Sequence, residues 1–213
     1  MKTLNLTFKR EKRTEIHTGC FEEVLTDIID KNRAVILIEE TVHELYRKTL
    51  PDLPMIVCAD GERKKDIKKV AEIVEVLQEL ELDRNCILIA IGGGSLTDLA
   101  GFVASVYLRG IKFGFIPTTF LAQVDAAIGH KTGIDVGEVK NSVGTFMPPH
   151  ALVLDTGFLE TLPSEELRSG MAEVLKHGLI RDVVFWKELA GIDGIRIPDA
   201  AIVQRAARIK MEI

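Results

Sequence analysis

The chain has 213 residues, of which 46% are apolar and 28% charged, and its formal net charge is −5. This composition is that of a globular protein with a core, and the acidic balance argues against a nucleic-acid partner, because such binders usually carry a basic excess or stripe. The polar start of the chain is not a signal peptide, and no run of about 18 apolar residues could span a membrane. We therefore expect a cytoplasmic protein without a membrane partner, which the three widely spaced cysteines also fit.

Strands and helices are predicted to alternate up to residue 155. Apolar runs predict the strands, and apolar residues that recur with a period of about 3.6 residues predict the helices. This alternation indicates an α/β domain with a mostly parallel sheet. The predicted elements are a strand at 33–38, a helix at 40–50, a strand at 55–59, a helix at 67–80, a strand at 86–91, a helix after residue 94, and strands at 113–116 and 152–154.

The run IGGGSLTD, residues 91–98, joins the predicted strand at 86–91 to the helix that follows. Its three consecutive glycines let the backbone approach a bulky anion, and the start of the helix offers unpaired N–H groups and a positive dipole end. A phosphate or pyrophosphate is the natural ligand of such a place, and a tight turn without a ligand is the alternative. Ligands of parallel sheets bind at the carboxyl ends of strands, so 60–62 and 117–119 should lie at the same edge as this glycine turn.

These two further segments carry polar groups. Residues 60–65 follow a strand and open a helix, so Glu62 could accept hydrogen bonds from ribose or adenine, with Lys65 one turn later. An ordinary solvated helix start is the alternative. Thr118 and Thr119 end a strand, where their hydroxyl groups could bind a ligand or cap the turn.

The region from residue 125 to 141 is predicted to be a long loop that contains glycines. It holds Lys131 between two glycines, and Lys140 and Asn141 follow. Two lysines and an asparagine in such a loop suit a phosphate or carboxylate group, and loops of this length are usually functional or disordered. A plain surface loop is the alternative.

After residue 155 the pattern predicts helices only. Ser164 is the expected N-cap of the first helix, with Glu165 and Glu166 in its first turn. Two more helices are predicted, at 182–189 and from residue 198 onward. The apolar stripe of the last helix reaches the final residue without a capping glycine or asparagine, so we expect a truncated chain whose stripe exposes apolar surface. The stripe consists of Ile202, Ala206, Ile209 and Ile213.

The first of these helices carries three polar residues, Glu173, Lys176 and His177, at positions that share one face. A surface salt bridge is one interpretation, and its contribution to stability would be small. The other interpretation is a metal ligand beside an anion-binding lysine. Glu173 and His177 could both bind one metal at this spacing, although two ligands do not complete a site.

Two stretches of the sequence carry a resemblance to a known family. They are GGGSLTDLAGFVASVYLRGIKFGFIPTTFLAQVDAAIGHKTGIDVGEVKNSVGTF and DTGFLETLPSEELRSGMAEVLKHGLI. They resemble 3-dehydroquinate synthase, of the sugar phosphate cyclase superfamily, closely over 60–180 and loosely elsewhere. The resemblance implies a homodimer in which a Rossmann-like, NAD-binding α/β domain at 1–155 is followed, at 156–213, by the beginning of an all-α domain that binds metal and substrate.

The resemblance also implies a reaction. The family converts 3-deoxy-D-arabino-heptulosonate 7-phosphate to 3-dehydroquinate and phosphate, a lyase step on the shikimate route to aromatic amino acids, with catalytic NAD and a divalent metal, zinc or cobalt. NAD oxidises an alcohol, phosphate leaves, and the ketone is reduced again before the ring closes. The alternatives are another sugar phosphate cyclase, a glycerol or iron-type alcohol dehydrogenase, which would accumulate NADH, or an NAD-binding fragment without activity.

Residue roles follow from the same resemblance. Glu173 matches a metal ligand, and Arg109 matches an arginine that reaches the substrate phosphate of the neighbouring subunit. The matches to other active-site positions are Asp125, Lys131, Asn141 and Lys176. The matches to nucleotide contacts, some of them shared with the substrate, are Asp60, Gly61, Glu62, Arg63, Lys64, Lys65, Gly93, Gly94, Ser95, Leu96, Thr97, Asp98, Thr118, Thr119, Lys131, Lys140, Phe158, Leu159, Glu160 and Thr161.

Two departures from the family pattern bear on these expectations. The family usually has glycine where His130 stands, so this side chain is expected to alter the loop and its contacts with substrate. The family's other two metal ligands are histidines in a downstream segment, and none of the five histidines of this chain occupies that context. We therefore expect the chain by itself to hold a metal weakly and to be inactive.

Overall fold

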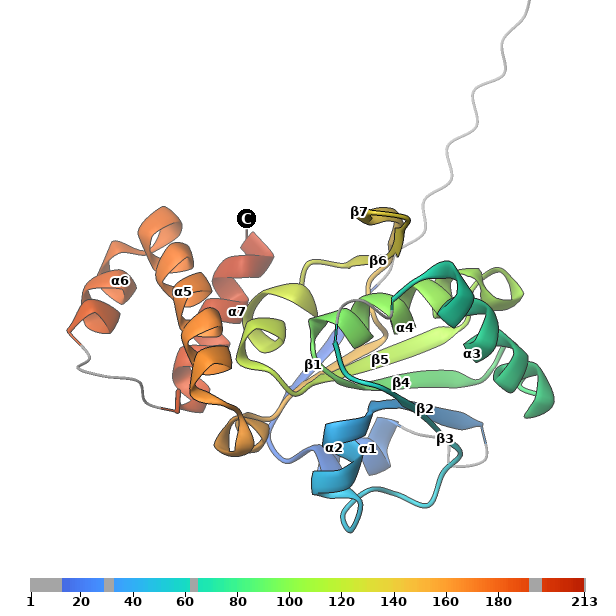
Figure 1. Ribbon diagram of the computed structural model, residues 1–213. Helices are drawn as coiled ribbons and strands as arrows, with labels where there is room; N and C mark the ends of the chain where they lie inside the picture. The colour runs from blue at the N-terminus through green and yellow to red at the C-terminus, as the bar shows by residue number, and fades with distance from the viewer. Residues whose placement is uncertain (1–12, 29–32, 62–64, 192–196, 213) are drawn as a thin grey trace, which may run out of the picture.

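The computed structural model describes residues 13–28, 33–61, 65–191 and 197–212. Within them, a six-stranded sheet carries helices on both faces, and the helices of the C-terminal part of the chain form a separate group beside it (Figure 1). The Rossmann-like α/β sheet that the sequence predicts is therefore confirmed. No helix among these residues is long and apolar enough to cross a membrane.

The strands of the main sheet all run parallel, so their carboxyl ends lie at one edge. The central strands are continuous apolar runs because both faces of the sheet are covered. Parallel neighbours also need crossover connections, which the helices supply. In order across the sheet, the strands are β1 (Glu15–Thr18), β8 (Ala151–Leu154), β5 (Lys112–Pro117), β4 (Ile87–Gly92), β2 (Ala34–Glu39) and β3 (Met55–Cys58).

Successive side chains of a strand point to opposite faces, and the sheet therefore has an apolar core on each side. Leu37 of β2 belongs to one core, and its neighbour Ile36 belongs to the other. Figure 1 shows helices on both sides of the sheet. The first core is covered by α3 (Ile67–Glu79) and α4 (Gly94–Val106), and the second by α1 (Phe21–Ile28) and α2 (Glu40–Tyr46).

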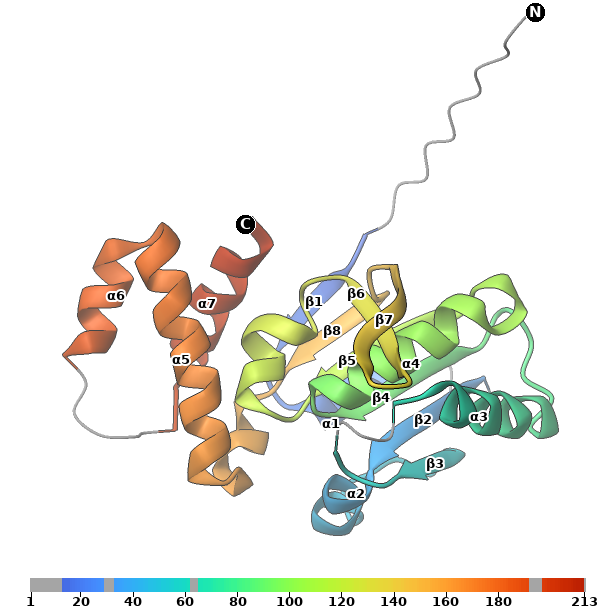
Figure 2. The same cartoon turned by 45° about the horizontal axis from the view of Figure 1, so that its top comes forward.

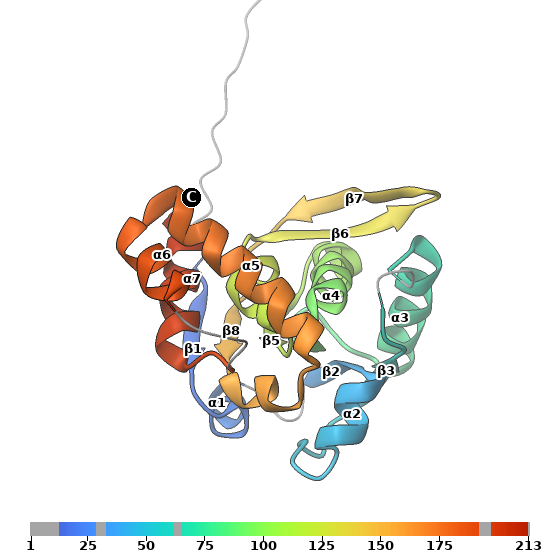
Figure 3. The ribbon, with the colours of Figure 1, turned by 60° about the vertical axis from the view of Figure 1, so that its left-hand side comes forward.

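An antiparallel hairpin, β6 (Lys131–Val136) and β7 (Val139–Phe146), lies across the outer side of α4 (Figure 3). The packing is close, because a Cβ atom at Gly101 of α4 would lie 2.3 Å from the methyl group of Thr132. The expectation of a long loop here is wrong. A short helix of π type, η3 (Ala122–Ala126), and the hairpin replace it. Glycine, lysine and asparagine are poor strand formers, so local composition concealed these strands.

Several short elements also differ from those that the apolar periodicity predicts. The strand β1 and the helix α1 are not predicted, because each is too short to show a period clearly. The helix predicted at 40–50 ends at Tyr46. Two segments of 3₁₀ type complete the chain, η2 (Tyr107–Arg109) after α4 and η4 (Thr156–Thr161) after β8.

The C-terminal helices form their own group beside the sheet (Figure 2). Two of them, α5 and α7, contact η3. This packing corrects the expectation of an exposed stripe on the last helix, because Ala206 and Ile209 are buried. The last member of that stripe, Ile213, lies outside the described residues. The three helices are α5 (Ser164–Arg181), α6 (Val183–Ala190) and α7 (Ala200–Glu212).

The contact between α5 and the α/β part depends on Gly170. A Cβ atom at this position would lie 2.5 Å from the ring of Phe120, which is itself fully buried. We expect Gly170→Ala to lower the free energy of unfolding by about 1–3 kcal/mol, as overpacking of a core usually does. Chemical denaturation measures the change. The control Gly191→Ala, whose Cβ would meet only ordinary van der Waals distances, should be nearly neutral, and equal effects of the two changes would contradict the prediction.

Candidate functional site

The carboxyl edge of the sheet borders a cavity of about 680 Å³, between the glycine turn and the first turn of α5. It gathers side chains from the ends of β2, β4 and β5, from η4 and from the hairpin. Because the carboxyl ends of parallel strands meet at one edge, segments distant in sequence lie together here. The predicted nucleotide contacts that line the cavity are Asp60, Gly61, Lys65, Gly93, Gly94, Ser95, Asp98, Thr118, Thr119, Phe158 and Thr161.

The other predicted nucleotide contacts are placed differently. The side chains of Leu96, Thr97 and Leu159 are buried in the core, and the Thr97 hydroxyl donates to the carbonyl of its own helix. Only their backbone could reach a ligand in the cavity. Glu160 is exposed within η4, and Lys140 is exposed on β7. Lys131 is exposed at the start of β6, and Glu62, Arg63 and Lys64 lie outside the described residues.

A carboxylate that the sequence argument missed reaches into the glycine turn. Glu39, the last residue of β2, accepts a hydrogen bond of 2.8 Å from the backbone N–H of Gly93. Burial raises the pKa of Glu39, and the negative charges of Asp60 and Glu166 add to the rise. The signal available in the sequence was its position directly after a predicted buried strand, at the edge where ligands bind.

The buried ammonium group of Lys65 connects α3, α4 and the hairpin. Its side chain is 3% exposed, and its Nζ lies 3.0 Å from a carboxylate oxygen of Asp98 and 2.8 Å from the amide oxygen of Asn141. The backbone N–H of Asn141 in turn donates to Asp135, 2.7 Å away. Asp98 lies one turn inside α4, so it does not cap the helix start, which falls at Gly93. Its carboxylate instead neutralises Lys65.

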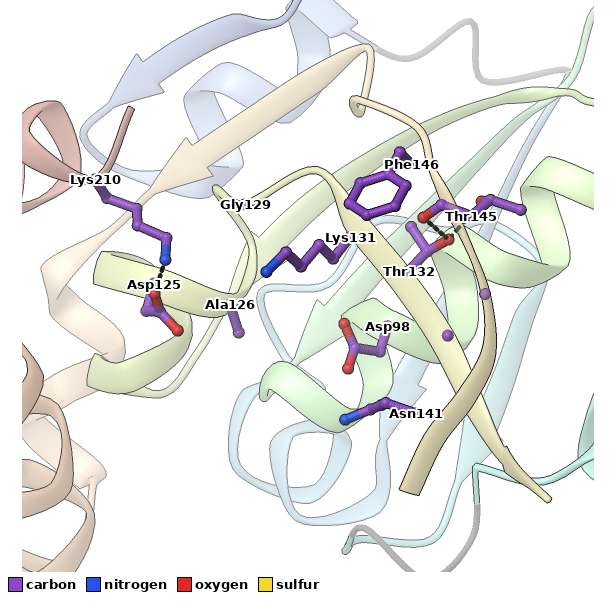
Figure 4. A pocket seen from close by; sticks show the side chains of 12 residues that line it. Asp98, Asp125, Ala126, Gly129, Lys131, Thr132, Asn141, Thr145, Phe146 and Lys210 are labelled. Carbon is purple, nitrogen blue, oxygen red and sulfur yellow. Dashed lines mark hydrogen bonds and ion pairs between the residues drawn. The ribbon is translucent and has the colours of Figure 1, made fainter. Parts of the chain in front are cut away.

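A second cavity of about 570 Å³ adjoins the first and shares Asp98 and Asn141 with it (Figure 4). In Figure 4, Lys131 extends from the start of β6 toward η3. Lys210 reaches the same space from α7, and its Nζ lies 2.5 Å from a carboxylate oxygen of Asp125. Two ammonium groups thus border a cavity that is open to a small anion. Lys210 was missed because nothing in the local sequence connects α7 with η3.

A cluster of metal-ligating side chains lies beside this cavity, where α5 packs on η3. Asp125, Glu173 and His177 each offer one ligand atom, and these atoms lie within 4.8 Å of one another. Nε2 of His177 is 3.1 Å from a Glu173 oxygen, and Lys176 contacts the same carboxylate. The structure therefore brings Asp125 and His177 next to Glu173 and Lys176. Asp125 and His177 each supply a further atom that could bind a metal.

The imidazole of His177 is 1% exposed, and neither ring nitrogen makes a hydrogen bond with a described residue. Burial lowers the pKa of His177, against the opposing effect of the Glu173 and Asp125 charges. A neutral imidazole and two carboxylates are donors that suit zinc or cobalt. An orphaned buried ring beside two carboxylates fits a divalent metal better than it fits an apolar core.

Arg109 is not brought together with these residues. It lies in η2, ahead of the start of β5, and therefore at the amino edge of the sheet. It lines a separate cavity that also includes Arg13, Arg84 and Lys112. Both Leu108 and Arg109 have positive φ angles, 48° and 67°, which are uncommon for residues other than glycine and often mark functional sites.

His130, which stands where the family resemblance implies a glycine, also has a positive φ of 55°. Glycine reaches this conformation without steric cost, whereas a Cβ atom opposes it. The exposed imidazole lines another cavity, together with Pro148 and Met211, beside the hairpin. The substitution therefore places strain at the entry to β6, one residue before Lys131.

Sequence comparison relates the chain to proteins of known function. Residues 55–169 match the family described as 3-dehydroquinate synthase N-terminal. The chain is 46% identical over 173 residues to a 3-dehydroquinate synthase of Saccharolobus solfataricus, covering 81% of this chain and 49% of that protein. It is 40% identical over 200 residues to one of Halorhodospira halophila, covering 89% and 56%. The chain thus spans about half the length of the curated relatives it matches.

Solved structures agree with the fold. ValA, a 2-epi-5-epi-valiolone synthase from Streptomyces hygroscopicus subsp. jinggangensis 5008 with NAD+ and Zn2+ bound, is 28% identical, with a TM-score of 0.83 over 98% of this chain and 63% of that one. A 2-deoxy-scyllo-inosose synthase complexed with carbaglucose-6-phosphate, NAD+ and Co2+ has a TM-score of 0.71 at 22% identity, over 93% and 59%. At 22% identity, the similarity to the 2-deoxy-scyllo-inosose synthase shows the fold alone.

The raised pKa of Glu39 leads to a pH-dependent prediction. The folded state holds this proton more tightly than the unfolded state, so the stability that it contributes is present below the unfolded pKa and is lost as the pH rises through the raised value. Glu39→Gln should therefore raise the melting temperature at neutral pH by a few degrees, at about 2–4 °C per kcal/mol for this size. The difference should shrink toward acid pH.

Thermal unfolding followed by circular dichroism across the pH range measures this change. The control is Glu40→Gln, which removes a charge from the exposed neighbour. A Glu39→Gln protein that is less stable than wild type at every pH would show that the hydrogen bond to Gly93 outweighs the cost of burying the carboxylate.

Proposed function

The chain belongs to the 3-dehydroquinate synthase family, and from this we propose that it supplies the NAD-binding part, and the beginning of the metal-binding part, of an enzyme that forms 3-dehydroquinate. The proposed substrate is 3-deoxy-D-arabino-heptulosonate 7-phosphate, and phosphate is the second product. The observation that carries the proposal is the pair of adjoining cavities, one at a glycine turn and one bordered by lysines, which share Asp98 and Asn141. NAD and a phosphorylated substrate would then lie side by side.

The cavity at the glycine turn suits NAD. The first turn of α4 presents N–H groups without intrahelical acceptors, and the pyrophosphate would bind there. Glu39 and Asp60 would accept hydrogen bonds from ribose hydroxyl groups, and Thr118 and Thr119, which line the same cavity, would add hydroxyl donors. NAD, when bound, supplies reversible acceptance of a hydride. The ValA structure, which holds NAD+, supports this assignment.

The second cavity suits the substrate. Lys131 and Lys210 would bind its anionic groups, since cations in a partly dry cleft attract phosphate or carboxylate more strongly than on an open surface. Asn141 and Asp125 would orient its hydroxyl groups. A zinc or cobalt ion held at Glu173 would polarise the alcohol that loses the hydride.

Further proposals concern the assembly. Arg109 lies at the sheet edge opposite the cavities, so it could contact substrate only in a neighbouring subunit, which supports a homodimer. We also propose a division between the two domains near residue 155, where the last strand of the main sheet ends and helices begin. Three free cysteines, two of them buried, support a cytoplasmic location, since disulfides are rare there.

Asp98 should contribute to NAD affinity, because it lines the cavity and neutralises the buried Lys65. We expect Asp98→Ala to weaken NAD binding by about tenfold, which corresponds to ~1.4 kcal/mol. Calorimetric titration with NAD measures the change. The control is Asp52→Ala, at an exposed position. Equal affinities of wild type and Asp98→Ala would reject the role given to Asp98.

Lys176 should act in turnover and not in NAD binding, because its ammonium lies on α5 against Glu173. In the enzyme that contains this chain, Lys176→Ala should reduce kcat/KM for phosphate release by roughly 100- to 1000-fold, the usual cost of losing one charge-stabilising group. NAD affinity should stay the same, and Lys187→Ala, an exposed change on α6, should have no effect. Unchanged turnover would rule out this assignment, and net accumulation of NADH would indicate a dehydrogenase instead.

A further inference from the structure

Phe146, the last residue of β7, exposes 81% of its side chain, although it belongs to a hairpin that packs on α4. An exposed apolar side chain by itself needs no explanation, because much of any protein surface is apolar. The position of this one is unusual, because the ring borders the second cavity, which Lys131 and Lys210 also line (Figure 4). The ring is therefore placed where it can act on the groups that would bind an anion.

Lys131 and Phe146 stand directly opposite each other at the open end of the hairpin. The backbone N–H of Met147 donates to the carbonyl of His130, 2.9 Å away. In an antiparallel ladder such hydrogen-bonded pairs alternate with pairs that are not hydrogen-bonded, so the next pair, Lys131 and Phe146, is of the second kind. Facing side chains approach most closely in pairs of this kind. The ring and the lysine stem therefore lie side by side, as Figure 4 shows.

The neighbouring pair of the hairpin keeps the ring in this place. Thr132 and Thr145 face each other, and their hydroxyl oxygens lie 2.7 Å apart. The Thr132 hydroxyl also donates to the carbonyl of Thr145 at 3.2 Å, and its methyl group occupies the space beside Gly101 of α4. A slip of register by one residue would carry Phe146 to the other face of the hairpin, and these contacts oppose it.

The contact with the ring restricts what the Lys131 side chain can do. A lysine loses much conformational freedom when its ammonium group is held at a binding site, and that loss weakens binding. A stem that lies along an apolar ring keeps its carbon atoms on the ring and its charged end in polar surroundings, so many other conformations are already excluded. In Figure 4 the Lys131 stem runs past the Phe146 ring and directs its ammonium group toward η3. The ring thus orients the lysine before an anion binds.

We propose that Phe146 is a positioning residue for Lys131, which holds the ammonium group in the direction of the second cavity and so increases its affinity for an anion. This inference rests on the proposed function for the role of Lys131 in binding an anionic group of the substrate. It adds to that function a residue without charge or hydrogen-bonding groups. The effect of the ring should disappear when Lys131 is absent, whereas a direct contact between ring and ligand would persist.

The test is a double-mutant cycle on the chain, titrated with inorganic phosphate and followed by calorimetry. Phe146→Ala should weaken phosphate binding about two- to tenfold, the usual cost of immobilising one flexible side chain. In the Lys131→Gln background the same change should have no effect. Phe146→Tyr, which keeps the ring, should bind like wild type. So should the control Val139→Ala, an exposed apolar change at the other end of the hairpin.

An equal loss of phosphate affinity in both backgrounds would overturn the proposal, because the ring would then act without the lysine. Unchanged affinity in Phe146→Ala, or a wild-type chain that binds no phosphate, would overturn it too. Sedimentation of the same proteins gives the alternative: if Phe146→Ala alters self-association and leaves phosphate affinity unchanged, the ring belongs to an interface between subunits.

Because the ring is so exposed, Phe146→Ala should fold. If it does not, NMR of the wild-type chain decides instead, since ring-current shifts of the Lys131 methylene protons support the contact and unshifted protons overturn it. NAD titration separates this inference from the proposed function. Coupling between Phe146 and Lys131 in a chain that does not bind NAD supports the positioning role and rejects the proposed function. NAD binding without such coupling rejects the positioning role alone.

Discussion

The buried ammonium group of Lys65 fixes the relative positions of the parts on which the rest of the site depends. It joins the segment before α3 to Asp98 of α4 and to Asn141 of β7. A hydrogen bond to a charged group typically contributes about 1.5–3 kcal/mol. Separating the hairpin from α4 would therefore cost the hydrogen bond between the Lys65 ammonium and Asn141. Because both cavities share Asp98 and Asn141, this one interaction also determines how a nucleotide and a substrate would face each other.

The elements with strong local signals were predictable from the sequence. The apolar runs of β2, β4 and β8 and the helical period of α3 gave the parallel sheet, and the glycine turn gave the edge at which its cavity opens. Most of the nucleotide contacts suggested by the family resemblance line that cavity, since motifs at strand ends meet once the sheet forms. Local patterns were sufficient here because one requirement, the burial of apolar side chains, determines where these strands and helices form.

Features that depend on tertiary contact were not predictable. The hairpin is rich in residues with poor strand propensity, and it forms because α4 offers a surface to cover. Glu39 was missed because its partner, the N–H of Gly93, is 54 residues away. Lys210 was missed for the same kind of reason, since its contact with Asp125 requires α7 to fold back on η3. The sequence pattern of one chain gives no information on contacts between residues so distant in sequence, unless a related protein supplies it.

The close approach of the hairpin to α4 also constrains how this sequence can vary. With no room for a Cβ atom at Gly101 while Thr132 keeps its methyl group, the two positions cannot change independently. A larger residue at position 101 would require a smaller one at position 132, and the energetic effects of such a pair would be strongly non-additive. Among descendants of this sequence, substitutions at these two sites should therefore arise as compensating pairs, so that a permissive change on the hairpin precedes any change within the helix.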